Sequence, residues 1–348
     1  MGKNMLREIS IDECSELSDA LYIDVRSENE FEEGTIPGAV NIPIFNNEER
    51  AVIGTIYTKE SPQKARDIGL EIVSRKLPDL YKQVEEAAEK RPILLFCWRG
   101  GMRSKSLAAV LDLMGLPVFR LIGGYKAYRH SIVSFFETGF HHQVIVLKGN
   151  TGTGKTELLK KLKEEGYPVI DLEGLSNNRG SVFGCIGLGA QPTQKTFESL
   201  LYEEIHRYNH DLYLVMECES RRIGKITLPD AVFKAMQQGI SVLVYDSLDN
   251  RAKRLMLEYT DNPGMTEELK TALDRLTKRL GRKKIDQLYD FLQKQAYEDF
   301  ARYLIMEYYD QLYGYPNQQS EGYDLCVSQE SMLLSLKILK QFLNNRFA

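Results

Sequence analysis

Short apolar runs alternate with longer amphipathic stretches along most of the chain. Each run has the length of a buried strand, whereas the stretches between the runs repeat apolar residues at helical spacing. Strands that alternate with helices indicate an α/β fold with parallel sheets and helices on both faces. The predicted strands lie at residues 21–25, 93–96, 117–121, 144–148, 168–172, 212–220 and 240–246.

Three stretches carry the helical pattern most clearly. They lie at residues 62–89, 104–114 and 157–164, and in the first of them apolar residues recur with lysines and glutamates between them. From Asp249 onward the chain is predicted to be helical. The strand pattern restarts near residues 137–142, and a length of 348 residues is enough for two domains. We therefore predict two α/β domains, at residues 12–137 and 141–348, the second with a helical C-terminal part.

Composition narrows the classes of protein that the chain can belong to. The net charge is −4, so contact with nucleic acid must use local basic patches. Five cysteines show no paired spacing, which favours a reducing cytosol over a disulfide framework. The N-terminus has no apolar core of signal-peptide length, and no apolar run approaches about 18 residues. We predict a cytoplasmic protein without membrane contact. His206 and His210 have no further ligand nearby in the sequence, so no tightly bound metal is expected.

The stretch ILLFCWRGGMRS, residues 93–104, carries the first candidate chemistry. Cys97 stands where a buried strand stops, and Gly100 and Gly101 separate it from a helix that begins near Arg103. Glycines let the backbone curl with its amides inward, and the helix N-terminus adds positive charge. Such a ring stabilises a thiolate and an oxyanion attached to its target. The predicted catalytic residues are Cys97, Arg99 and Arg103; the alternative is an inert buried cysteine.

This loop resembles the active loop of rhodanese-type sulfurtransferases, and residues 22–43, YIDVRSENEFEEGTIPGAVNIP, resemble the opening pattern of that family. The resemblance implies a rhodanese-like first domain whose Cys97 carries a chalcogen atom. Arg103 follows Cys97 by six residues, whereas a common rhodanese loop uses five. The resulting C-x5-R spacing is shared with dual-specificity phosphatases of the same fold. We therefore expect a wider loop that accepts a larger tetrahedral anion.

The stretch GNTGTGKT, residues 149–156, carries the second candidate chemistry. It matches G-x-x-x-x-G-K-[ST], the P-loop, with a predicted strand before it and a helix after it. In this motif backbone amides wrap a phosphate, the lysine reaches the terminal phosphate, and the hydroxyl can ligate Mg²⁺. The second domain is therefore predicted to be P-loop NTPase-like. The predicted phosphate-binding residues are Gly149, Gly152, Gly154, Lys155 and Thr156.

Charged residues at strand ends and in polar loops supply further candidates. Asp171 and Glu217 follow predicted strands and are candidates to hold Mg²⁺ through water; the alternative is ordinary strand-end acids. Asp24 and Arg26 either order the active-site side of the first domain, as the rhodanese resemblance implies, or form a surface ion pair worth about 0–1 kcal/mol. Long polar loops at residues 174–194 and 219–229 suit an extended anion. They contribute the candidates Arg179, Arg221 and Arg222.

A cluster of basic residues lies in the predicted C-terminal helices. Six of them fall within ten positions and could bind an RNA backbone. The alternative is a solvated face of an amphipathic helix. The predicted RNA-binding patch is Arg275, Lys278, Arg279, Arg282, Lys283 and Lys284.

The combination of a chalcogen-handling thiol and a P-loop resembles the tRNA 2-selenouridine synthase family over essentially the whole chain. The matching stretches are FCWRGGMRS, GGYKAYR, GNTGTGKTELL, DLEGLSNNRGSVFG, QPTQKTFE and ESRRIGKITLP. The resemblance implies a transferase that replaces sulfur by selenium in 2-thiouridine at the tRNA wobble position. It implies selenophosphate and geranyl diphosphate as co-substrates, an S-geranylated intermediate, and a Cys97 perselenide. The implied partners are thiolated tRNA and, as a selenium donor, selenophosphate synthase.

The role of the P-loop remains a separate hypothesis. We expect residues 149–156 to hold geranyl diphosphate, because the implied reaction consumes an allylic diphosphate and needs no nucleotide triphosphate. No tightly bound cofactor is expected, and Mg²⁺ is compatible with the motif. The alternatives are a sulfurtransferase fused to a P-loop small-molecule kinase, a C-x5-R phosphatase with a regulatory nucleotide domain, and a pair of binding modules.

Overall fold

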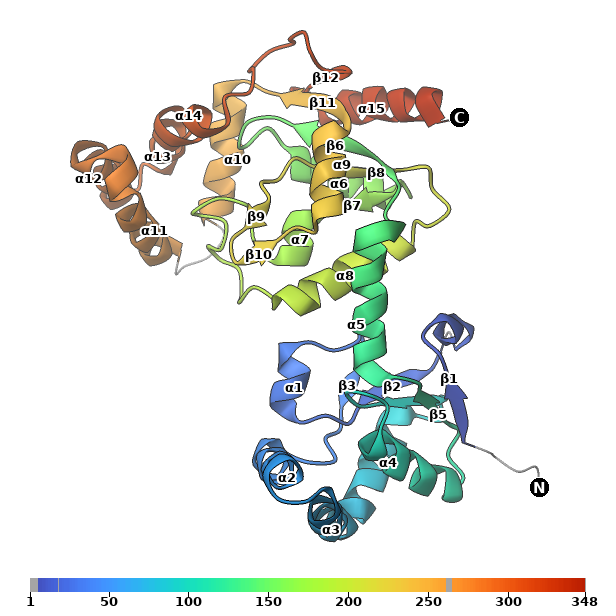
Figure 1. Ribbon diagram of the computed structural model, residues 1–348. Coiled ribbons are helices and arrows are strands. Elements are labelled where there is room, and N and C mark those ends of the chain that lie inside the picture. The colour runs from blue at the N-terminus through green and yellow to red at the C-terminus, as the bar shows by residue number, and fades with distance from the viewer. Residues whose placement is uncertain (1–5, 18, 261–264, 348) are drawn as a thin grey trace. The chain divides into compact units, whose positions relative to one another are not determined.

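The computed structural model describes residues 6–17, 19–260 and 265–347 (Figure 1). The chain divides into two compact units, residues 1–135 with 198–200, and residues 136–197 with 201–348. Each unit is built around one five-stranded parallel sheet. The predicted α/β class with parallel sheets is therefore confirmed.

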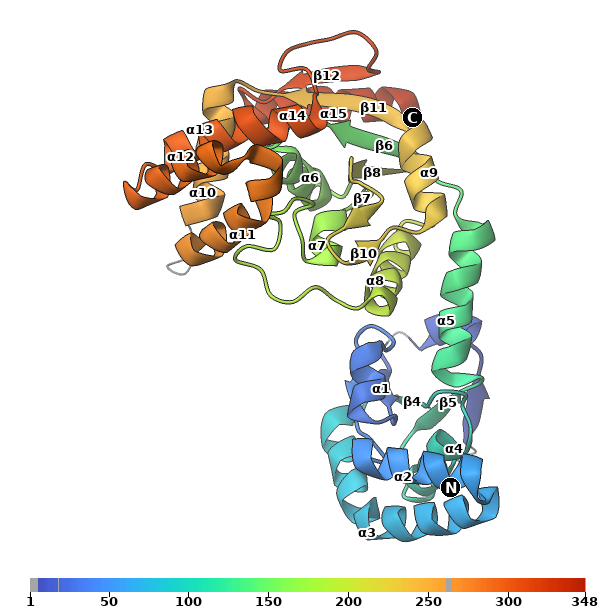
Figure 2. The same ribbon diagram turned by 60° about the vertical axis from the view of Figure 1, so that its left-hand side comes forward.

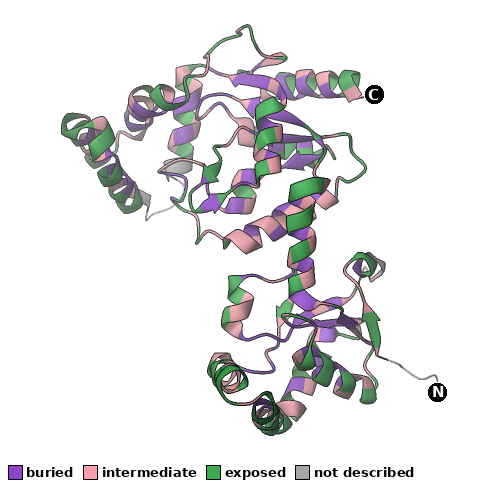
Figure 3. Cartoon of the chain, in the orientation of Figure 1, coloured by how far each residue is buried: buried purple, intermediate pink, exposed green. Residues whose placement is uncertain are grey.

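The sheet of the first unit has the strand order β1-β5-β4-β2-β3. Strand β4 coincides with the predicted strand at residues 93–96, and its four residues are fully buried because strands flank it on both sides (Figure 3). The predicted helix at 62–89 is the single long helix α3, which lies beside α2 (Figure 2). The strands are β1 Arg7–Ile9, β2 Leu21–Asp24, β3 Val40–Asn41, β4 Ile93–Phe96 and β5 Val118–Leu121. The helices are η1 Asp12–Glu16, α1 Glu28–Glu33, α2 Asn47–Lys59, α3 Pro62–Ala88, α4 Met102–Leu113 and α5 Gly124–Ser134.

The hydrophobic core of this unit explains why these elements pack together. Ile93 and Leu95 of β4 form one cluster with Val84 of α3 and Leu107 of α4. Successive strand side chains point to opposite faces, so Leu94 and Phe96 face the other side, where they are also buried. Strands β4 and β5 run parallel, so both end at the same edge of the sheet. The glycine-rich segments that follow them therefore meet at that edge.

The sheet of the second unit has the strand order β12-β11-β6-β8-β7. Helices α6 and α15 cover one face, where their leucines share a cluster with β6 and β11. The strands are β6 Gln143–Lys148, β7 Val169–Ile170, β8 Tyr213–Glu217, β11 Ile240–Tyr245 and β12 Leu325–Ser328, with a hairpin of β9 Arg222–Ile223 and β10 Ile226–Thr227. The helices are η2 Phe135–Gly139, α6 Lys155–Glu164, α7 Leu172–Ser176, α8 Gln194–His206, α9 Asp230–Gln238 and α15 Met332–Phe347.

The C-terminal region differs from the uniform helix expected after Asp249. Strand β12 interrupts it and pairs in parallel with β11. Four residues cannot form a stable strand alone, so β12 depends on the exposed edge of β11, which the local sequence does not reveal. The remaining helices are α10 Leu248–Thr260, α11 Met265–Leu280, α12 Arg282–Gln293, α13 Tyr297–Leu304, η3 Ile305–Tyr309 and α14 Asp310–Tyr313.

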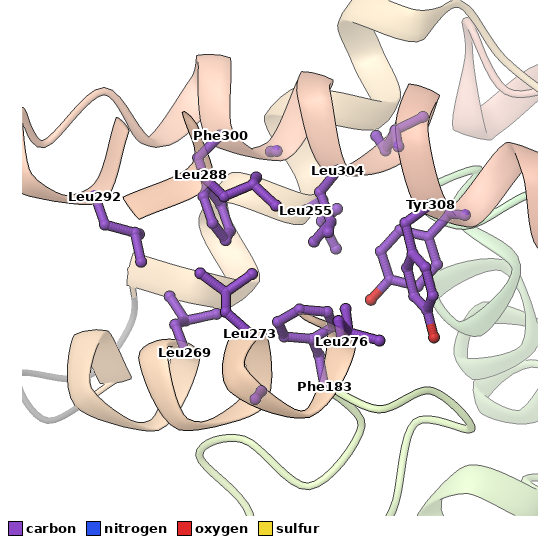
Figure 4. Packing of buried hydrophobic residues seen from close by; sticks show 14 of the residues in the cluster. Phe183, Leu255, Leu269, Leu273, Leu276, Leu288, Leu292, Phe300, Leu304 and Tyr308 are labelled. Atoms are coloured by element: carbon purple, nitrogen blue, oxygen red, sulfur yellow. The ribbon is translucent and has the colours of Figure 1, made fainter. Parts of the chain in front are cut away.

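Helices α10 to α13 enclose a second hydrophobic cluster (Figure 4). Leucines and Phe300 supply most of it, and Phe183 and Ile186 enter it from the polar loop at 174–194. Burial of these two side chains anchors a loop that its polar composition alone would leave free.

Among the helices formed by the described residues, we find none with the length and the low polarity needed to cross a lipid bilayer.

Candidate functional site

The first candidate site is the loop between β4 and α4, which begins with Cys97. The N-terminus of α5 holds this loop from one side, because the Tyr125 amide donates to the Cys97 carbonyl at 2.9 Å and the Lys126 amide donates to the Trp98 carbonyl at 2.9 Å. Gly124 lies so close to the loop that a Cβ there would collide with the Cys97 carbonyl oxygen, and its φ is +59°. Glycine is therefore required at position 124, the second glycine of GGYKAYR, because the backbone there lies against the backbone of the Cys97 loop.

The thiol of Cys97 lies at the floor of this loop and is 3% exposed. Its Sγ is 3.3 Å from the Ser104 hydroxyl, which lies in the first turn of α4. On its other side Cys97 packs against the core of the sheet. The thiol is therefore buried but has a polar neighbour. Ser104 was not among the predicted residues, although it lies in the first turn of the helix that follows the loop.

The two arginines predicted beside Cys97 differ in their surroundings. Arg99 is exposed to solvent. Arg103 donates to the Glu30 carboxylate at 2.6 and 3.3 Å, and Arg50 lies 3.3 Å from the same carboxylate. Burial alone would raise the pKa of Glu30, but the hydrogen bond and charge of Arg103, and the charge of Arg50, outweigh it and lower that pKa. An anion in the loop must therefore compete with Glu30 for Arg103.

One further arginine, on the neighbouring strand β5, holds the Cys97 loop. Arg120 of β5 donates to the Gly100 carbonyl and to the Glu8 carboxylate. Arg120 was not predicted, because only the parallel register of β4 and β5 brings it under the loop.

The ion pair between Arg26 and Asp24 is fully buried, with contacts of 2.5 to 3.0 Å. The Arg26 guanidinium also lies 4.2 Å from the centre of the Tyr125 ring. The Tyr125 amide donates to the Cys97 carbonyl, so the Arg26–Asp24 pair packs against a residue that holds the Cys97 loop. The alternative of a surface ion pair is wrong.

The second candidate site is the loop between β6 and α6, residues 149–154. The Lys155 ammonium donates to the Gly149 carbonyl at 2.9 Å and to the Asn150 carbonyl at 3.3 Å. Other loop carbonyls are held by arginines of α10: the Arg251 Nε donates to the Thr151 carbonyl at 2.9 Å. This arrangement turns the loop carbonyls toward protein donors and fits a P-loop, whose amides face a phosphate.

The C-terminal segment also holds the P-loop. The Asn150 side chain donates to the Tyr315 carbonyl at 2.7 Å and accepts from the Tyr315 amide at 3.1 Å. Arg251 donates to Asp310 and to Asn317. Neither Asn150 nor Arg251 was predicted, because their partners lie many residues away in the chain.

Three carboxylates gather next to Thr156, and one of them, Glu217, is a predicted candidate. The Thr156 hydroxyl lies 3.4 Å from Glu173 and 3.4 Å from Glu217. Oxygen atoms of Glu173, Glu217 and Glu219 all lie within 4.8 Å of one another. Asp171 instead caps α7, where its side chain accepts from the Gly174 amide at 2.8 Å. Of the two predicted candidates, Glu217 lies in this group, whereas the side chain of Asp171 caps a helix and Glu173, which was not predicted, lies beside Thr156.

The electrostatics of this group favour a positive ligand. Burial, followed by the charges of Glu173 and Glu219, raises the pKa of Glu217 well above its ordinary value. Burial raises the pKa of Glu219 to about 7, although the charge of Lys155 opposes this. Crowded, buried carboxylates hold protons unless a cation is present. Mg²⁺ fits this donor set, since it prefers oxygen ligands.

The remaining predicted arginines of the polar loops serve local structure. Arg179 donates to the Ile186 carbonyl at 3.1 Å within its own loop. Arg221 pairs with Asp230 on the surface at 2.5 Å. Arg222 donates to the Gly224 carbonyl in the β9–β10 hairpin.

The predicted basic patch lies on α11 and α12. All its members except the half-buried Lys284 are exposed. Three have a structural partner: Arg282 pairs with Asp286, Lys284 pairs with Glu307, and Arg279 lies over the Tyr308 ring. Part of this charge is therefore neutralised within the helices themselves.

Comparison with known proteins assigns both units to described families. Residues 10–131 match the rhodanese-like domain, and residues 142–341 match the tRNA 2-selenouridine synthase AAA domain. The chain is 35% identical to a tRNA 2-selenouridine synthase of Hydrogenovibrio crunogenus, covering 86% of this chain and 90% of that protein. It is 31% identical to one of Shewanella denitrificans and 34% identical to one of a Sulfurovum species, each covering 86% of this chain and 89% of that protein.

Among solved structures, the chain is similar to a shikimate kinase from Bacteroides thetaiotaomicron. The sequence identity is 18% and the TM-score is 0.27, covering 58% of this chain and 98% of the kinase.

Proposed function

The chain belongs to the tRNA 2-selenouridine synthase family, and from this premise we propose that it is a tRNA-modifying transferase that replaces sulfur by selenium in 2-thiouridine at the wobble position. The observation that carries the proposal is the presence of two loops in one chain: a cysteine loop with a buried thiol and a P-loop with Lys155 and Thr156. A thiol alone or a phosphate site alone would fit many enzymes.

We propose that geranylation of the tRNA sulfur is the first step and that it uses the P-loop. The sulfur attacks the allylic carbon of geranyl diphosphate, the carbon–oxygen bond breaks with its electrons going to the diphosphate, and the N3 proton of the base is released to solvent. Lys155 and the loop amides would stabilise the charge that develops on this leaving group. Thr156 and the neighbouring glutamates would hold Mg²⁺, which would add to that stabilisation.

Selenium transfer follows in this proposal and uses the Cys97 loop. S-Alkylation turns C2 of the base into an activated, isothiourea-like centre, from which a selenium nucleophile displaces the geranylthiolate. That nucleophile would come from selenophosphate bound beside Cys97: its phosphorus–selenium bond breaks with the electrons going to selenium, and water takes the phosphoryl group as phosphate. Selenophosphate synthase is the candidate source of the selenophosphate. The loop amides and an arginine freed from Glu30 would hold the phosphate group. The motivation is the proximity of Cys97 to Ser104 and to the N-terminus of α4.

Tests of both steps use mass spectrometry of tRNA nucleosides after incubation with geranyl diphosphate and selenophosphate. Lys155→Ala should lose geranylation, whereas Lys160→Ala, an exposed lysine on the same helix, should retain it. Cys97→Ala should lose selenation and keep geranylation, whereas Cys185→Ala, an exposed cysteine, should keep both. Normal geranylation by the Lys155 variant, or equal loss of both products in a folded Cys97 variant, would overturn these assignments. ATP turnover without RNA would instead favour the P-loop kinase alternative.

The basic patch is proposed to contact the RNA backbone. Arg275, Lys278 and Lys283 are exposed, and no ion pair or cation–π contact is found for them within the described part of the chain. Each phosphate contact adds about −0.9 to the slope of log affinity against log salt. Replacing all three by glutamine should therefore weaken tRNA binding and flatten this slope. An unchanged slope would remove the patch from the interface.

A further inference from the structure

We propose that Trp98, Arg99 and Lys126 form a nucleotide-binding surface at the Cys97 loop. In this proposal the Trp98 ring stacks on the RNA base that is to be modified, and the two cations bind the phosphates next to that base. The inference deepens the proposed function and rests on it, because it takes the base to be that of a tRNA. It does not depend on the geranylation step.

Trp98 is held firmly at the loop and yet is only half-buried. Its carbonyl accepts from the Lys126 amide at 2.9 Å, which fixes its backbone to the N-terminus of α5. The Trp98 ring centre lies 5.8 Å from that of Tyr125 and 5.9 Å from the Arg26 guanidinium. These contacts cover part of the indole and leave the rest in solvent. An aromatic surface that is fixed but exposed suits stacking on an unpaired base.

The cations around the loop fall into two groups. Three form ion pairs with carboxylates of the protein, namely Arg26, Arg103 and Arg120. Arg99 and Lys126 are exposed, and no ion pair or side-chain hydrogen bond is found for either within the described part of the chain. Arg99 follows Trp98 directly, and Lys126 is bonded to its backbone. Unpaired cations beside an exposed aromatic ring are the combination that binds single-stranded nucleic acid.

The depth of the thiol gives this surface a purpose. Cys97 is 3% exposed, so a base reaches it only after leaving the stack of its neighbours in the RNA. Unstacking costs free energy, and stacking on an aromatic side chain offsets that cost. Trp98 adjoins Cys97 in the chain, where consecutive Cα atoms lie about 3.8 Å apart. The ring also favours RNA over an acidic peptide, which the cations alone would attract as well.

The test uses the full-length protein and an anticodon stem–loop RNA with 2-thiouridine at the wobble position. Trp98 is the single tryptophan of the chain, so its fluorescence reports contact at this position without any substitution. Stacking of the base should quench this fluorescence as RNA is added. The same RNA with an abasic wobble position should still bind, as the fluorescence anisotropy of a labelled copy shows, but should leave the tryptophan signal nearly unchanged.

Substitutions at Trp98 measure the contribution of stacking to affinity. Trp98→Leu should weaken RNA binding by about 5- to 150-fold, the range found when aromatic stacking partners of bases are removed. Trp98→Phe keeps an aromatic face and should lose less. Tyr57→Leu, at an exposed tyrosine of α2, is the matched control and should bind RNA like the wild type. Melting temperatures show that each variant is folded.

Substitutions of the two cations measure phosphate contacts. Arg99→Gln and Lys126→Gln should each flatten the slope of log affinity against log salt by about 0.7, the value for one phosphate contact to a single strand. Lys82→Gln, at an exposed lysine of α3, should leave the slope unchanged.

Three results would overturn the proposal. The first is unchanged Trp98 fluorescence at RNA concentrations that saturate binding. The second is equal quenching by the thiolated and the abasic RNA. The third is quenching by polyglutamate as strong as that by RNA, which would assign the surface to an acidic protein.

The nucleoside assay separates this proposal from the proposed function. A wild type that converts 2-thiouridine but shows any of these three results would refute only the nucleotide-binding surface. A wild type that stacks the base on Trp98 but converts none of it would support the surface and contradict the proposed function.

Discussion

Arg120 provides the sharpest test of how the Cys97 loop is held in place. Arg120 is 8% exposed, and its guanidinium donates to the Gly100 carbonyl and to the Glu8 carboxylate. Arg120→Met keeps the apolar stem of the side chain and removes both hydrogen bonds. We predict that this change lowers the free energy of unfolding of the first unit and the rate of tRNA selenation.

The size of the effect follows from burial of the acceptor. Gly100 is buried, so its carbonyl would lose a charged donor that water cannot readily replace. Leaving a buried acceptor unpaired costs about 1–3 kcal/mol, and bonds to charged groups lie toward the upper end of that range. The Glu8 side chain is 46% exposed, so water screens its ion pair with Arg120. Arg120→Met should therefore destabilise the unit by about 2 kcal/mol or more, and Glu8→Gln far less.

The assay is urea unfolding followed by the fluorescence of Trp98, the single tryptophan of the chain, two residues before Gly100. It therefore reports unfolding at the loop itself. Glu8→Gln serves as the control, because it removes the ion pair and leaves the bond to Gly100. If both variants unfold at the same urea concentration as the wild type, the bond from Arg120 to Gly100 does not stabilise the loop and the reasoning is wrong.

Two further predictions concern stability. Gly124→Ala should destabilise the first unit by more than Gly115→Ala, as urea midpoints would show. Both glycines have positive φ, which costs an alanine about 1–2 kcal/mol. Only at Gly124 does the new Cβ also meet backbone atoms. Equal midpoints would mean that the α5 backbone can move away from the loop. His142 is buried, and burial lowers its pKa below the ordinary 6.5. The unfolded chain therefore binds a proton that the folded chain excludes, so the free energy of unfolding should fall as the pH drops below about 6.5. His142→Gln should reduce this loss in pH-dependent melting experiments, and an unchanged pH profile would assign the loss to other groups.

Local patterns in the sequence determined most of the secondary structure and both loops. The run at 93–96 became β4 because four consecutive apolar residues, preceded by Pro92 and followed within a few residues by Gly100 and Gly101, have the pattern of a short buried strand. The P-loop at 149–156 lies between β6 and α6, as its strand-and-helix context predicted. These features depend on residues that are adjacent in the chain, so the sequence alone contains the information that determines them.

Tertiary structure alone decided which charged side chains meet. Arg103 pairs with Glu30, which lies on a helix 73 residues earlier in the chain. Glu173, and not Asp171, lies beside Thr156: the Asp171 side chain caps α7, and Glu173, two residues later in the first turn of that helix, reaches the Thr156 hydroxyl. Side-chain pairing depends on strand register and on the rotation of each helix about its axis: a shift of one residue moves a strand side chain to the opposite face of the sheet and turns a helix side chain by about 100°. The sequence determined where the chemistry lies along the chain, whereas packing determined which residues share it.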